Sequence, residues 1–436
     1  MVMKSIKVGH ITYSASLQNL NAAMLLMHSL YVYEHINVFP LAHFFDEDHC
    51  ERYEIAGKEK SDRRLRFWRW LSRLPQRFLY KDRDNGLFFD PSCFGYDANA
   101  RIRSFDPDII HLHWVAASCL SLRRLGKLKT PVVWTLHDVW PLTAGCHANL
   151  GCNEWVRGCQ NCPQVGRPRM AGVERLLPSL TSAIFKARQR WYSSIADLYP
   201  IAPSRWLGDM ARKSPLLAGR NISVIPNCID TQIFSPNDTH KARRALHIPE
   251  GSRVIAFGAT DISIPYKGAD LLYEALHILK SFCTEPIHLL VFGASSLDES
   301  IKNLFPSTQL GVLRERHHVA RAMQCADLFV CPSRQDNFPN VLLESLACGI
   351  PAVGFRIGGI PELIRHKISG YVAEPFDCEE LAYGISWILQ SKERYTKLAS
   401  ECRSIAESEY SMPIISEQYS QLYRTIIEET ALRMSC

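Results

Sequence analysis

Two acids in the second half of the chain have the types and spacing needed to bind a phosphorylated ligand. Asp336 and Glu344 lie in "SRQDNFPNVLLES", where an apolar run ends, a polar loop follows and Pro339 predicts the start of a helix. Free N–H groups at a helix mouth suit an anionic phosphate. A carboxylate slightly deeper in the helix can accept hydrogen bonds from a ribose diol. The same pattern also fits a capped surface helix with incidental acids.

A lysine and a pair of glycines extend this candidate site. Lys267 in "IPYKGADLLYEAL" could neutralise the charge that develops on a departing diphosphate, without any metal. The alternative is an ordinary solvated surface lysine. Gly358 and Gly359 in "GGIPELI" follow a predicted strand. They either let the backbone approach a ligand closely or form a tight turn between strand and helix.

A histidine in the first half is a second candidate for chemistry. His137 and Asp138 end the apolar run "PVVWTLHD", and His111 and His113 end the neighbouring run "DIIHLHWV". Ligands of parallel sheets bind beyond the carboxyl ends of the strands. His137 therefore either contacts a ligand or is a satisfied histidine at a strand end. His111 and His113 either line an acceptor site or pack.

Four cysteines follow soon after, with the spacing C-x5-C-x6-C-x2-C: Cys146, Cys152, Cys159 and Cys162. Four thiolates would make a closed structural zinc site with no position left for substrate. Unligated thiols and disulfides are the other two interpretations, and a reducing compartment disfavours disulfides. We favour structural zinc in a clasp that stiffens the loop 146–162.

The elements that must position these residues alternate along all 436 residues. Apolar runs of strand length are each followed by a helical pattern, which predicts α/β layers with parallel sheets. The polar, proline-bracketed stretch 234–252 predicts a boundary. We expect two Rossmann-like, doubly wound domains that face each other across a cleft, at 1–234 and 235–412, and a helix at 413–436 that packs back on the first domain.

Taken together, these motifs resemble family 4 glycosyltransferases, which have the GT-B fold. The pair Asp336-x7-Glu344 is similar to the E-x7-E element of that family, with Asp in place of the first Glu. "VIPNCIDTQIFSP" resembles an interdomain element in which Cys228 replaces a glycine, a tolerated turn substitution rather than a catalytic cysteine. "TLHDVWPLTAGCHANLGCNEWVRGCQNCPQ" resembles enzymes that build colanic-acid-like exopolysaccharide or O-antigen units.

The resemblance implies roles for individual residues. Glu344 would hold the donor ribose, Asp336 would contact the transferred sugar, and Lys267 would bind phosphate. His137 would align the donor sugar. The remaining residues that the resemblance implies in donor binding are Phe338, Asn340, Val341, Gly358 and Gly359.

Two features depart from the family pattern. "AFGATD" has no basic residue after its strand, so the second phosphate cation is missing there. "SASLQNLNAA" stands where a glycine-rich loop is usual, so the acceptor contact is expected either to use small residues such as Ser14 or to differ.

Composition limits the partners. The net charge of +6 is mild and does not imply nucleic acid. The N-terminus lacks the apolar core of a signal peptide, so we expect a cytoplasmic protein. Residues 63–78 combine arginines with aromatic side chains, which fits either an anionic surface on the inner face of the cytoplasmic membrane or a helix packed on the sheet.

The predicted function is a retaining glycosyltransferase that moves a hexosyl group from a UDP- or GDP-sugar to a saccharide acceptor, expected to be lipid-linked, in bacterial surface polysaccharide synthesis. The resemblance implies no cofactor for catalysis beyond this donor. A sugar-nucleotide epimerase of the same fold and a non-catalytic sugar-nucleotide-binding or assembly protein are the alternatives.

Overall fold

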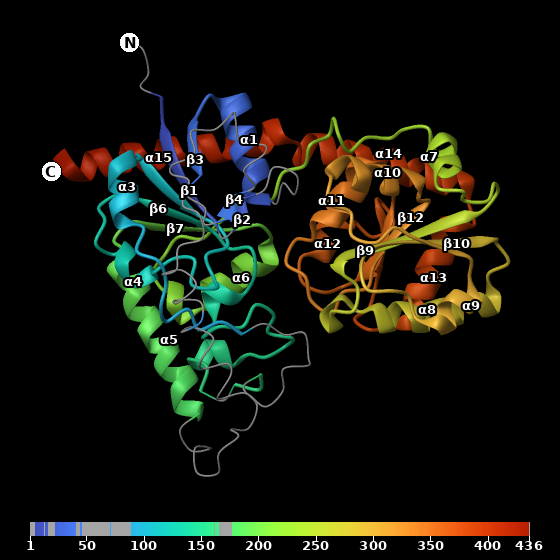
Figure 1. Ribbon diagram of the computed structural model, residues 1–436, viewed down its shortest axis with the longest axis horizontal. Helices are drawn as coiled ribbons and strands as arrows, with labels where there is room; N and C mark the ends of the chain where they lie inside the picture. Colours follow the sequence, from blue (N-terminus) through green and yellow to red (C-terminus); the bar gives the residue numbers. More distant parts are fainter. Residues whose placement is uncertain are drawn as a thin grey trace. The chain divides into compact units, whose positions relative to one another are not determined.

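Two six-stranded parallel sheets form the framework of the chain (Figure 1). The computed structural model describes residues 5–12, 14–15, 22–40, 44–45, 70, 89–160, 162–164 and 177–435. The chain divides into unit 1, residues 1–226 with 416–436, and unit 2, residues 227–415. The predicted α/β architecture with two doubly wound parallel-sheet domains is confirmed.

The sheet of unit 1 has the strand order β3-β1-β5-β6-β7-β8. Its strands are β1 (Lys7–Ile11), β3 (Asn37–Pro40), β5 (Ile109–Leu112), β6 (Val132–Thr135), β7 (Leu198–Ala202) and β8 (Ser223–Val224). Continuous apolar runs such as that of β6 are buried along their whole length, because helices and loops cover both faces of a parallel sheet. The strand order reverses between β1 and β5, and ligands bind at such a switch point.

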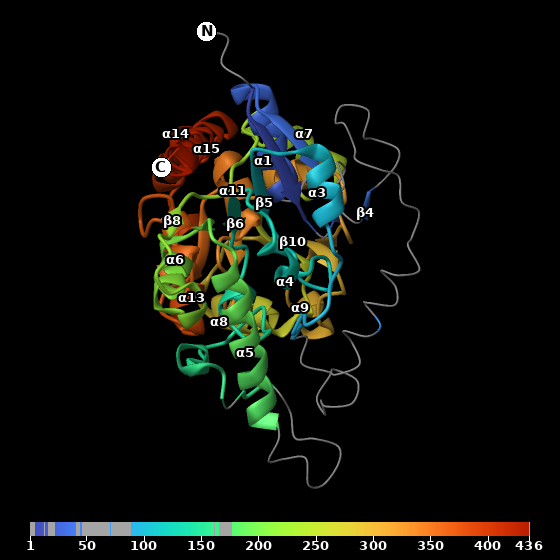
Figure 2. The same cartoon turned by 90° about the vertical axis from the view of Figure 1, so that its left-hand side faces the viewer.

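Helices and short strands complete unit 1. They are α1 (Ala22–Glu34), α3 (Asn99–Phe105), α4 (Leu122–Leu125), α5 (Leu177–Ser194), α6 (Arg205–Lys213) and the paired short strands β2 (Ser14–Ala15) and β4 (Phe44–Phe45). The long helix α5 extends away from the sheet in both views (Figures 1 and 2). It lies beside the cysteine loop, because the Thr181 hydroxyl donates to the Cys159 carbonyl over 2.6 Å.

The sheet of unit 2 has the strand order β11-β10-β9-β12-β13-β14. Its strands are β9 (Arg253–Asp261), β10 (Ile287–Ala294), β11 (Ser307–Gln309), β12 (Leu328–Cys331), β13 (Ala352–Phe355) and β14 (Gly370–Ala373). Numbered along the chain this is the dinucleotide-binding order 3-2-1-4-5-6, whose switch point lies between β9 and β12.

Nine helices of unit 2 are described, and the last one continues into unit 1. They are α7 (Thr239–Ala245), α8 (Ala269–Phe282), α9 (Glu299–Leu304), α10 (Arg316–Cys325), α11 (Asn340–Ala347), α12 (Ile360–Leu363), α13 (Cys378–Leu389), α14 (Lys392–Glu409) and α15 (Met412–Ser435). The predicted helix start at Pro339 differs by one residue, since Pro339 is the residue that precedes α11.

The boundary between the units lies earlier than the expected position at 234. The Ile229 N–H donates to the Tyr410 carbonyl over 2.8 Å, and the Met412 N–H donates to the Ile229 carbonyl over 3.1 Å. Phe234 is fully buried in a core of unit 2. Residues 227–234 therefore belong to unit 2. From Ser416 onward α15 belongs to unit 1, where Arg433 pairs with Asp197 over 2.5 Å.

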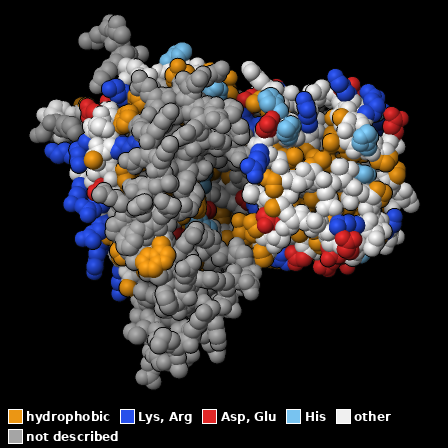
Figure 3. Space-filling view, viewed as in Figure 1, with side chains coloured by type: hydrophobic (Ala, Val, Ile, Leu, Met, Phe, Trp, Pro, Cys, Tyr) orange, Lys and Arg blue, Asp and Glu red, His pale blue; other side chains and the backbone are white. Residues whose placement is uncertain are grey.

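In the described part of the chain, no helix is both long and apolar enough to span a bilayer. On the face of unit 2 seen in Figure 3, Lys and Arg side chains are interspersed with Asp and Glu. The basic stretch 63–78 lies outside the described residues except for Trp70, which is exposed.

Candidate active site

An ion pair joins the two loops at the switch point of unit 2. Lys267 follows β9 and Asp336 follows β12, and these strands are neighbours in the sheet. The Lys267 Nζ lies 2.7 Å from an Asp336 carboxylate oxygen, and both side chains are largely buried. Burial lowers the pKa of Lys267, but the Asp336 carboxylate outweighs it and raises the pKa above its ordinary value. Lys267 is therefore a fixed cation.

The lysine loop is held against the aspartate loop by several contacts. Gly268 has a φ of +73°, and a Cβ there would lie 2.0 Å from the Pro332 carbonyl oxygen. The Arg334 N–H donates to the Tyr266 carbonyl over 2.8 Å. The Arg334 guanidinium makes two hydrogen bonds of 2.6 Å to Asp270 at the start of α8. Glycine at 268 is thus needed for the close approach that brings Lys267 to Asp336.

The predicted glycine pair holds the backbone of Asp336. Gly358 has a φ of +58°, and a Cβ there would lie 2.0 Å from the Asp336 carbonyl oxygen. The Gly359 N–H donates to the same oxygen over 3.0 Å. Both glycines therefore act through the loop that carries Asp336. A direct contact of their backbone with a donor stays a prediction.

Glu344 lies inside α11 beside a buried arginine that the sequence motifs do not identify. Burial raises the pKa of Glu344 to about 7, and the Arg316 charge opposes this rise. Arg316 begins α10, lies 3.5 Å from an Asp230 carboxylate oxygen and packs its guanidinium against the Phe234 ring. Its Nη1 is buried without a hydrogen-bond partner in the described structure. This Nη1 is the same atom that lies 3.5 Å from Asp230, so Arg316 is charge-paired with Asp230 but makes no hydrogen bond through that nitrogen among the described residues.

The other predicted donor-binding residues, on α11 and just before it, have contacts inside unit 2. Phe338 is buried and packs edge-on against the Tyr410 ring at 5.8 Å. The Asn340 side-chain oxygen accepts a hydrogen bond from the Asn227 amide over 3.1 Å. Val341 is half-buried against the core. Phe338 and Val341 therefore have packing roles here, and their contact with a donor stays a prediction.

Four histidines gather at the switch point of unit 1. His10 lies one residue before the end of β1, His111 one residue before the end of β5, and His113 and His137 follow β5 and β6. The His113 ring is within hydrogen-bond distance of both His10 and His137, at 2.9 and 3.2 Å between nitrogens. Burial lowers the pKa of His137 to about 4, although Asp138 partly offsets it. His137 is therefore a neutral imidazole near pH 7.

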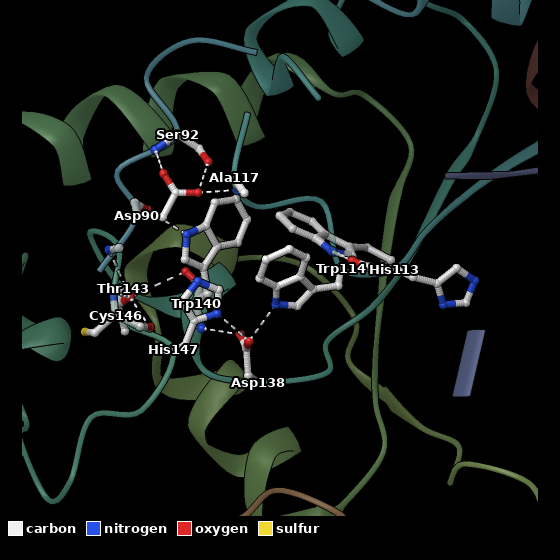
Figure 4. A network of polar contacts seen from close by, with 12 residues as sticks. Asp90, Ser92, His113, Trp114, Ala117, Asp138, Trp140, Thr143, Cys146 and His147 are labelled. Atoms are coloured by element: carbon white, nitrogen blue, oxygen red, sulfur yellow. Dashed lines mark hydrogen bonds and ion pairs between the residues drawn. The ribbon is translucent and has the colours of Figure 1, made fainter. Parts of the chain in front are cut away.

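Asp138 is the centre of a separate polar network (Figure 4). It accepts hydrogen bonds from the His147 ring over 2.6 Å, the Trp114 indole over 3.1 Å and the Trp140 N–H over 2.8 Å. Burial raises its pKa, but the His147 ring and these donors lower it below the ordinary value. Asp138 is thus an ionised acid held by the Trp114 indole and the Trp140 backbone N–H, and through His147 it fixes the start of the cysteine loop.

An arginine fastens the segment that leads into the cysteine loop. Arg188 of α5 is fully buried, packs on the Trp140 ring and donates to the carbonyls of Trp140 and Thr143 over 2.8 Å each. It also donates to the carbonyls of Asp90 and Pro91. The segment 140–143, which leads into the loop 146–162, is therefore held by hydrogen bonds from its carbonyls to one guanidinium.

In the described structure none of the four predicted zinc ligands takes part in a disulfide. Burial raises the pKa of Cys159 to about 12, and Cys152 and Cys162 raise it further, so the thiols lie close to one another. Among the described residues, the one group of three metal-ligating side chains with ligand atoms all within 4.8 Å is formed by His10, His111 and His113. In this arrangement the cysteines do not form a closed coordination shell, and zinc stays a prediction.

Two family models match the chain, one over most of unit 1 and the first residues of unit 2, the other within unit 2. The model described as Glycosyltransferase Family 4 matches residues 35–233. The model described as Glycosyl transferases group 1 matches residues 238–405. This chain belongs to the family 4 glycosyltransferases.

Named relatives and solved structures are similar to this glycosyltransferase. The N-acetyl-alpha-D-glucosaminyl L-malate synthase of Bacillus anthracis is 24% identical over 48% of this chain and 55% of its own length. The chain thus matches about half of that relative. Anabaena HepE in complex with UDP-glucose has a TM-score of 0.59 at 17% identity, covering 96% of this chain and 100% of that chain. WaaG, a glycosyltransferase involved in lipopolysaccharide biosynthesis, has a TM-score of 0.59 at 16% identity, covering 96% of this chain and 99% of that chain. The solved structures confirm the GT-B fold.

The structure of the glycosyltransferase brings together Lys267, Asp336, Gly358 and Gly359, and places Glu344 on the adjoining helix. Sequence reasoning missed Arg316 because "RERHHVAR" reads as an ordinary exposed helix start. It also missed His10, whose role requires the pairing of β1 with β5. The alternation of His111 and His113 on one strand was the available signal for the histidine cluster.

Proposed function

We propose that this glycosyltransferase moves a hexosyl group, with retention, from a UDP- or GDP-sugar to a saccharide acceptor on a lipid carrier in bacterial surface polysaccharide synthesis. The observation that carries this proposal is the buried Lys267–Asp336 pair at the switch point of unit 2, with Glu344 on the helix that follows. The two similar structures, with UDP-glucose bound in one and a lipopolysaccharide role in the other, support the donor and the pathway class.

The charges of the site suit a departing diphosphate. The bond between the anomeric carbon and the diphosphate oxygen breaks, and a bond to the acceptor oxygen forms. The hydroxyl proton leaves with the nucleoside diphosphate. Lys267 stabilises the negative charge that develops on the leaving group, which is electrostatic catalysis. Because Asp336 neutralises Lys267 in the donor-free state, the diphosphate must compete with this carboxylate, and Asp336 then becomes available to a sugar hydroxyl.

Glu344 is proposed to hold the ribose hydroxyls of the donor. Its carboxylate lies inside the first turns of α11, and a buried carboxylate with few partners gains most from new donors. Arg316 beside it favours the ionised form that accepts these hydrogen bonds. In unit 1, His137 is proposed to align the sugar.

A donor screen followed by a matched pair of lysine variants tests the proposal. Nucleotide sugars are first ranked by thermal shift, and transfer is then measured with lipid-linked saccharides. Lys267→Ala is expected to lower kcat by about 10²–10³, the cost of losing one transition-state stabiliser. Lys302→Ala is the control, since Lys302 is also in an ion pair of unit 2, with the exposed Glu299 three positions earlier on α9. Equal activity of the two variants would remove Lys267 from the site.

The same assay separates the alternatives. Conversion of the donor sugar in the absence of any acceptor would favour an epimerase. Tight nucleotide binding without turnover of any donor would favour a binding protein.

The proposal has three further parts. A structural zinc is bound by Cys146, Cys152, Cys159 and Cys162, and the transferred group is a hexosyl group. Residues 63–78 make peripheral contact with an anionic membrane on its cytoplasmic side. Metal analysis of protein purified under reducing conditions tests the zinc, and one zinc per chain is expected. Sedimentation with vesicles containing anionic lipid, against neutral vesicles, tests the membrane contact.

A further inference from the structure

Three imidazoles of unit 1 form a line of hydrogen bonds. The His10 Nδ1 lies 2.9 Å from the His113 Nε2, and the His113 Nδ1 lies 3.2 Å from the His137 Nε2. The two pairs have ring centroids 5.2 and 5.4 Å apart and ring planes that differ by 10° and 30°. Each nitrogen therefore faces the next roughly in the plane of its ring, which is the geometry of N–H···N hydrogen bonds.

Burial fixes the number of protons on the three hydrogen-bonded imidazoles. His10 and His113 are fully or almost fully buried. Burial lowers the pKa of His10 to about 3 and that of His137 to about 4, and burial also lowers the pKa of His113. Near pH 7 each ring is neutral and carries one N–H. His113 has one proton for its two hydrogen bonds. All three N–H groups must therefore point in the same direction along the line of imidazoles.

His10, at the buried end of this line of hydrogen bonds, decides that direction. The His10 Nε2 is buried and has no hydrogen-bond partner in the described structure. If the protons pointed inward, this nitrogen would carry an N–H without an acceptor, and orphaned buried donors are rarer than unfilled acceptors. The protons therefore point outward: His10 donates to His113, and His113 donates to His137. A line of hydrogen bonds that ends at a buried nitrogen cannot conduct protons. Its effect is instead to set the tautomer of His137.

We propose that His10 and His113 are positioning residues that fix the tautomer of His137, with its proton on Nδ1 and its Nε2 occupied as an acceptor. Resting on the proposed function, this makes His137 a hydrogen-bond donor to an oxygen of the transferred sugar. The outer nitrogen cannot then serve as a base that removes the acceptor proton. Figure 4 shows the His113 ring turned away from Asp138, so that acid does not compete for it.

A metal ion does not account for this geometry. The three imidazoles of His10, His111 and His113 lie close together, but both His111 nitrogens are engaged, with the Tyr423 hydroxyl at 2.6 Å and the Thr135 hydroxyl at 2.8 Å. The 2.9 Å between His10 and His113 is also shorter than the separation of about 3.3 Å between two ligand nitrogens of tetrahedral zinc.

The experiment reads the tautomer directly. Protein labelled with ¹⁵N-histidine is recorded by long-range proton–nitrogen NMR, and His137 is assigned by comparison with His137→Gln. The wild type is expected to show His137 protonated at Nδ1. This readout needs no glycosyl transfer, so its failure is distinct from failure of the proposed function. A wild-type His137 protonated at Nε2 would overturn the proposal.

Two isosteric variants add a functional readout. In His113→Asn the amide nitrogen can occupy the position of Nδ1 and still donate to His137. In His113→Asp the carboxylate accepts only, so it places a proton on the His137 Nε2. We expect kcat to fall about tenfold or more in the His113→Asp variant and much less in the His113→Asn variant. His111→Phe is the control for packing, because His111 lies beside these rings but is not part of the line of hydrogen bonds from His10 to His137. Equal kcat and equal His137 spectra for Asn and Asp would contradict the inference.

Discussion

The switch points of the two sheets use opposite chemistry. In unit 1 the edge carries neutral imidazoles, linked to one another and to hydroxyl groups. In unit 2 the edge carries full charges, with Lys267 against Asp336 and Arg316 near Glu344. Neutral donors and acceptors orient a ligand, whereas fixed charges stabilise charge that appears during a reaction. The comparison suggests that unit 1 aligns and unit 2 carries the charge of the leaving group.

Burial acts in opposite directions on these two sets of groups. It disfavours the charged form, so it lowers the pKa of His10 and His137 and raises that of Glu344. Acid must therefore charge buried groups in unit 1 but discharges a buried group in unit 2. The difference can be tested through pH, glycine geometry and charge removal.

The largest expected effect is a selective loss of stability of unit 1 in acid. A histidine with a lowered folded-state pKa contributes stability that is present above the ordinary value of 6.5 and is lost as the pH falls toward 4 and 3. Because each unit of pKa shift corresponds to about 1.4 kcal/mol, several buried histidines together amount to several kcal/mol. Glu344 has the opposite sign, since its contribution is greatest below 4.5 and is lost as the pH rises toward 7.

Hydrogen exchange by peptide mass spectrometry at pH 7 and pH 5, corrected for the intrinsic exchange rate, checks this prediction. Peptides of β1, β5 and β6 should lose protection at pH 5, while peptides of β9 and β12 should keep it. Unit 2 serves as the internal control. Equal loss of protection in both sheets would show that the histidine cluster does not set the acid response.

The next effect is steric and concerns the loop of Asp336. Gly358→Ala would place a Cβ 2.0 Å from the Asp336 carbonyl oxygen at a φ of +58°. Gly311→Ala is a matched control in unit 2, with a φ of +64° and nothing within 4 Å of the added Cβ. The control should cost about 1 kcal/mol from its backbone conformation alone, and Gly358→Ala roughly 3 kcal/mol.

Urea unfolding measures both free energies, and nucleotide-sugar titration measures binding. Gly358→Ala should also weaken donor binding, because Asp336 and its partner Lys267 would shift. If both variants lose the same stability, Gly358 has no special contact with the aspartate loop.

The sequence predicted those features that local patterns determine. Apolar runs with helical crossovers identified both sheets, and the acids around Pro339 identified the loop and helix that lie beside Lys267. The interactions of these residues depend on strand order, which is a long-range property. The Lys267–Asp336 pair requires β9 and β12 to be neighbours, although 69 positions separate the two residues.

The features that were missed have the same cause. Arg316 is buried only because α10 packs against residues 227–234, and the boundary expected at 234 assigned those residues to the other domain. His10 lies opposite His111 through the parallel pairing of β1 and β5, which no local motif shows. A stiff cysteine loop was expected from zinc, which stays a prediction; the hydrogen bonds of Arg188 on α5 hold Trp140 and Thr143, just before that loop.

A smaller effect is a pH dependence of donor binding that originates in unit 2. Burial raises the pKa of Glu344 to about 7, and the ionised form is the better acceptor for ribose hydroxyls. Donor affinity should therefore rise with pH by up to about tenfold per unit below the pKa and level off above it. Isothermal titration with UDP-glucose between pH 5.5 and 8.5 measures this. Glu344→Gln should bind weakly with a flat profile, and an unchanged slope in this variant would assign the pH dependence to another group.

The smallest effect should move the midpoint of that profile without removing it. The Arg316 charge lowers the pKa of Glu344 against the effect of burial. Arg316→Gln removes this charge, so the midpoint should move to higher pH by at most about one unit, while Arg316→Lys should leave it near the wild-type value. Arg356→Gln is the control, because Arg356 belongs to an exposed ion pair of unit 2 with Glu374. A midpoint that moves equally in the Arg316→Gln and Arg356→Gln variants would mean that Glu344 senses the net charge of unit 2 rather than its buried neighbour, and the charged edge would then act as a diffuse field instead of a set of specific pairs.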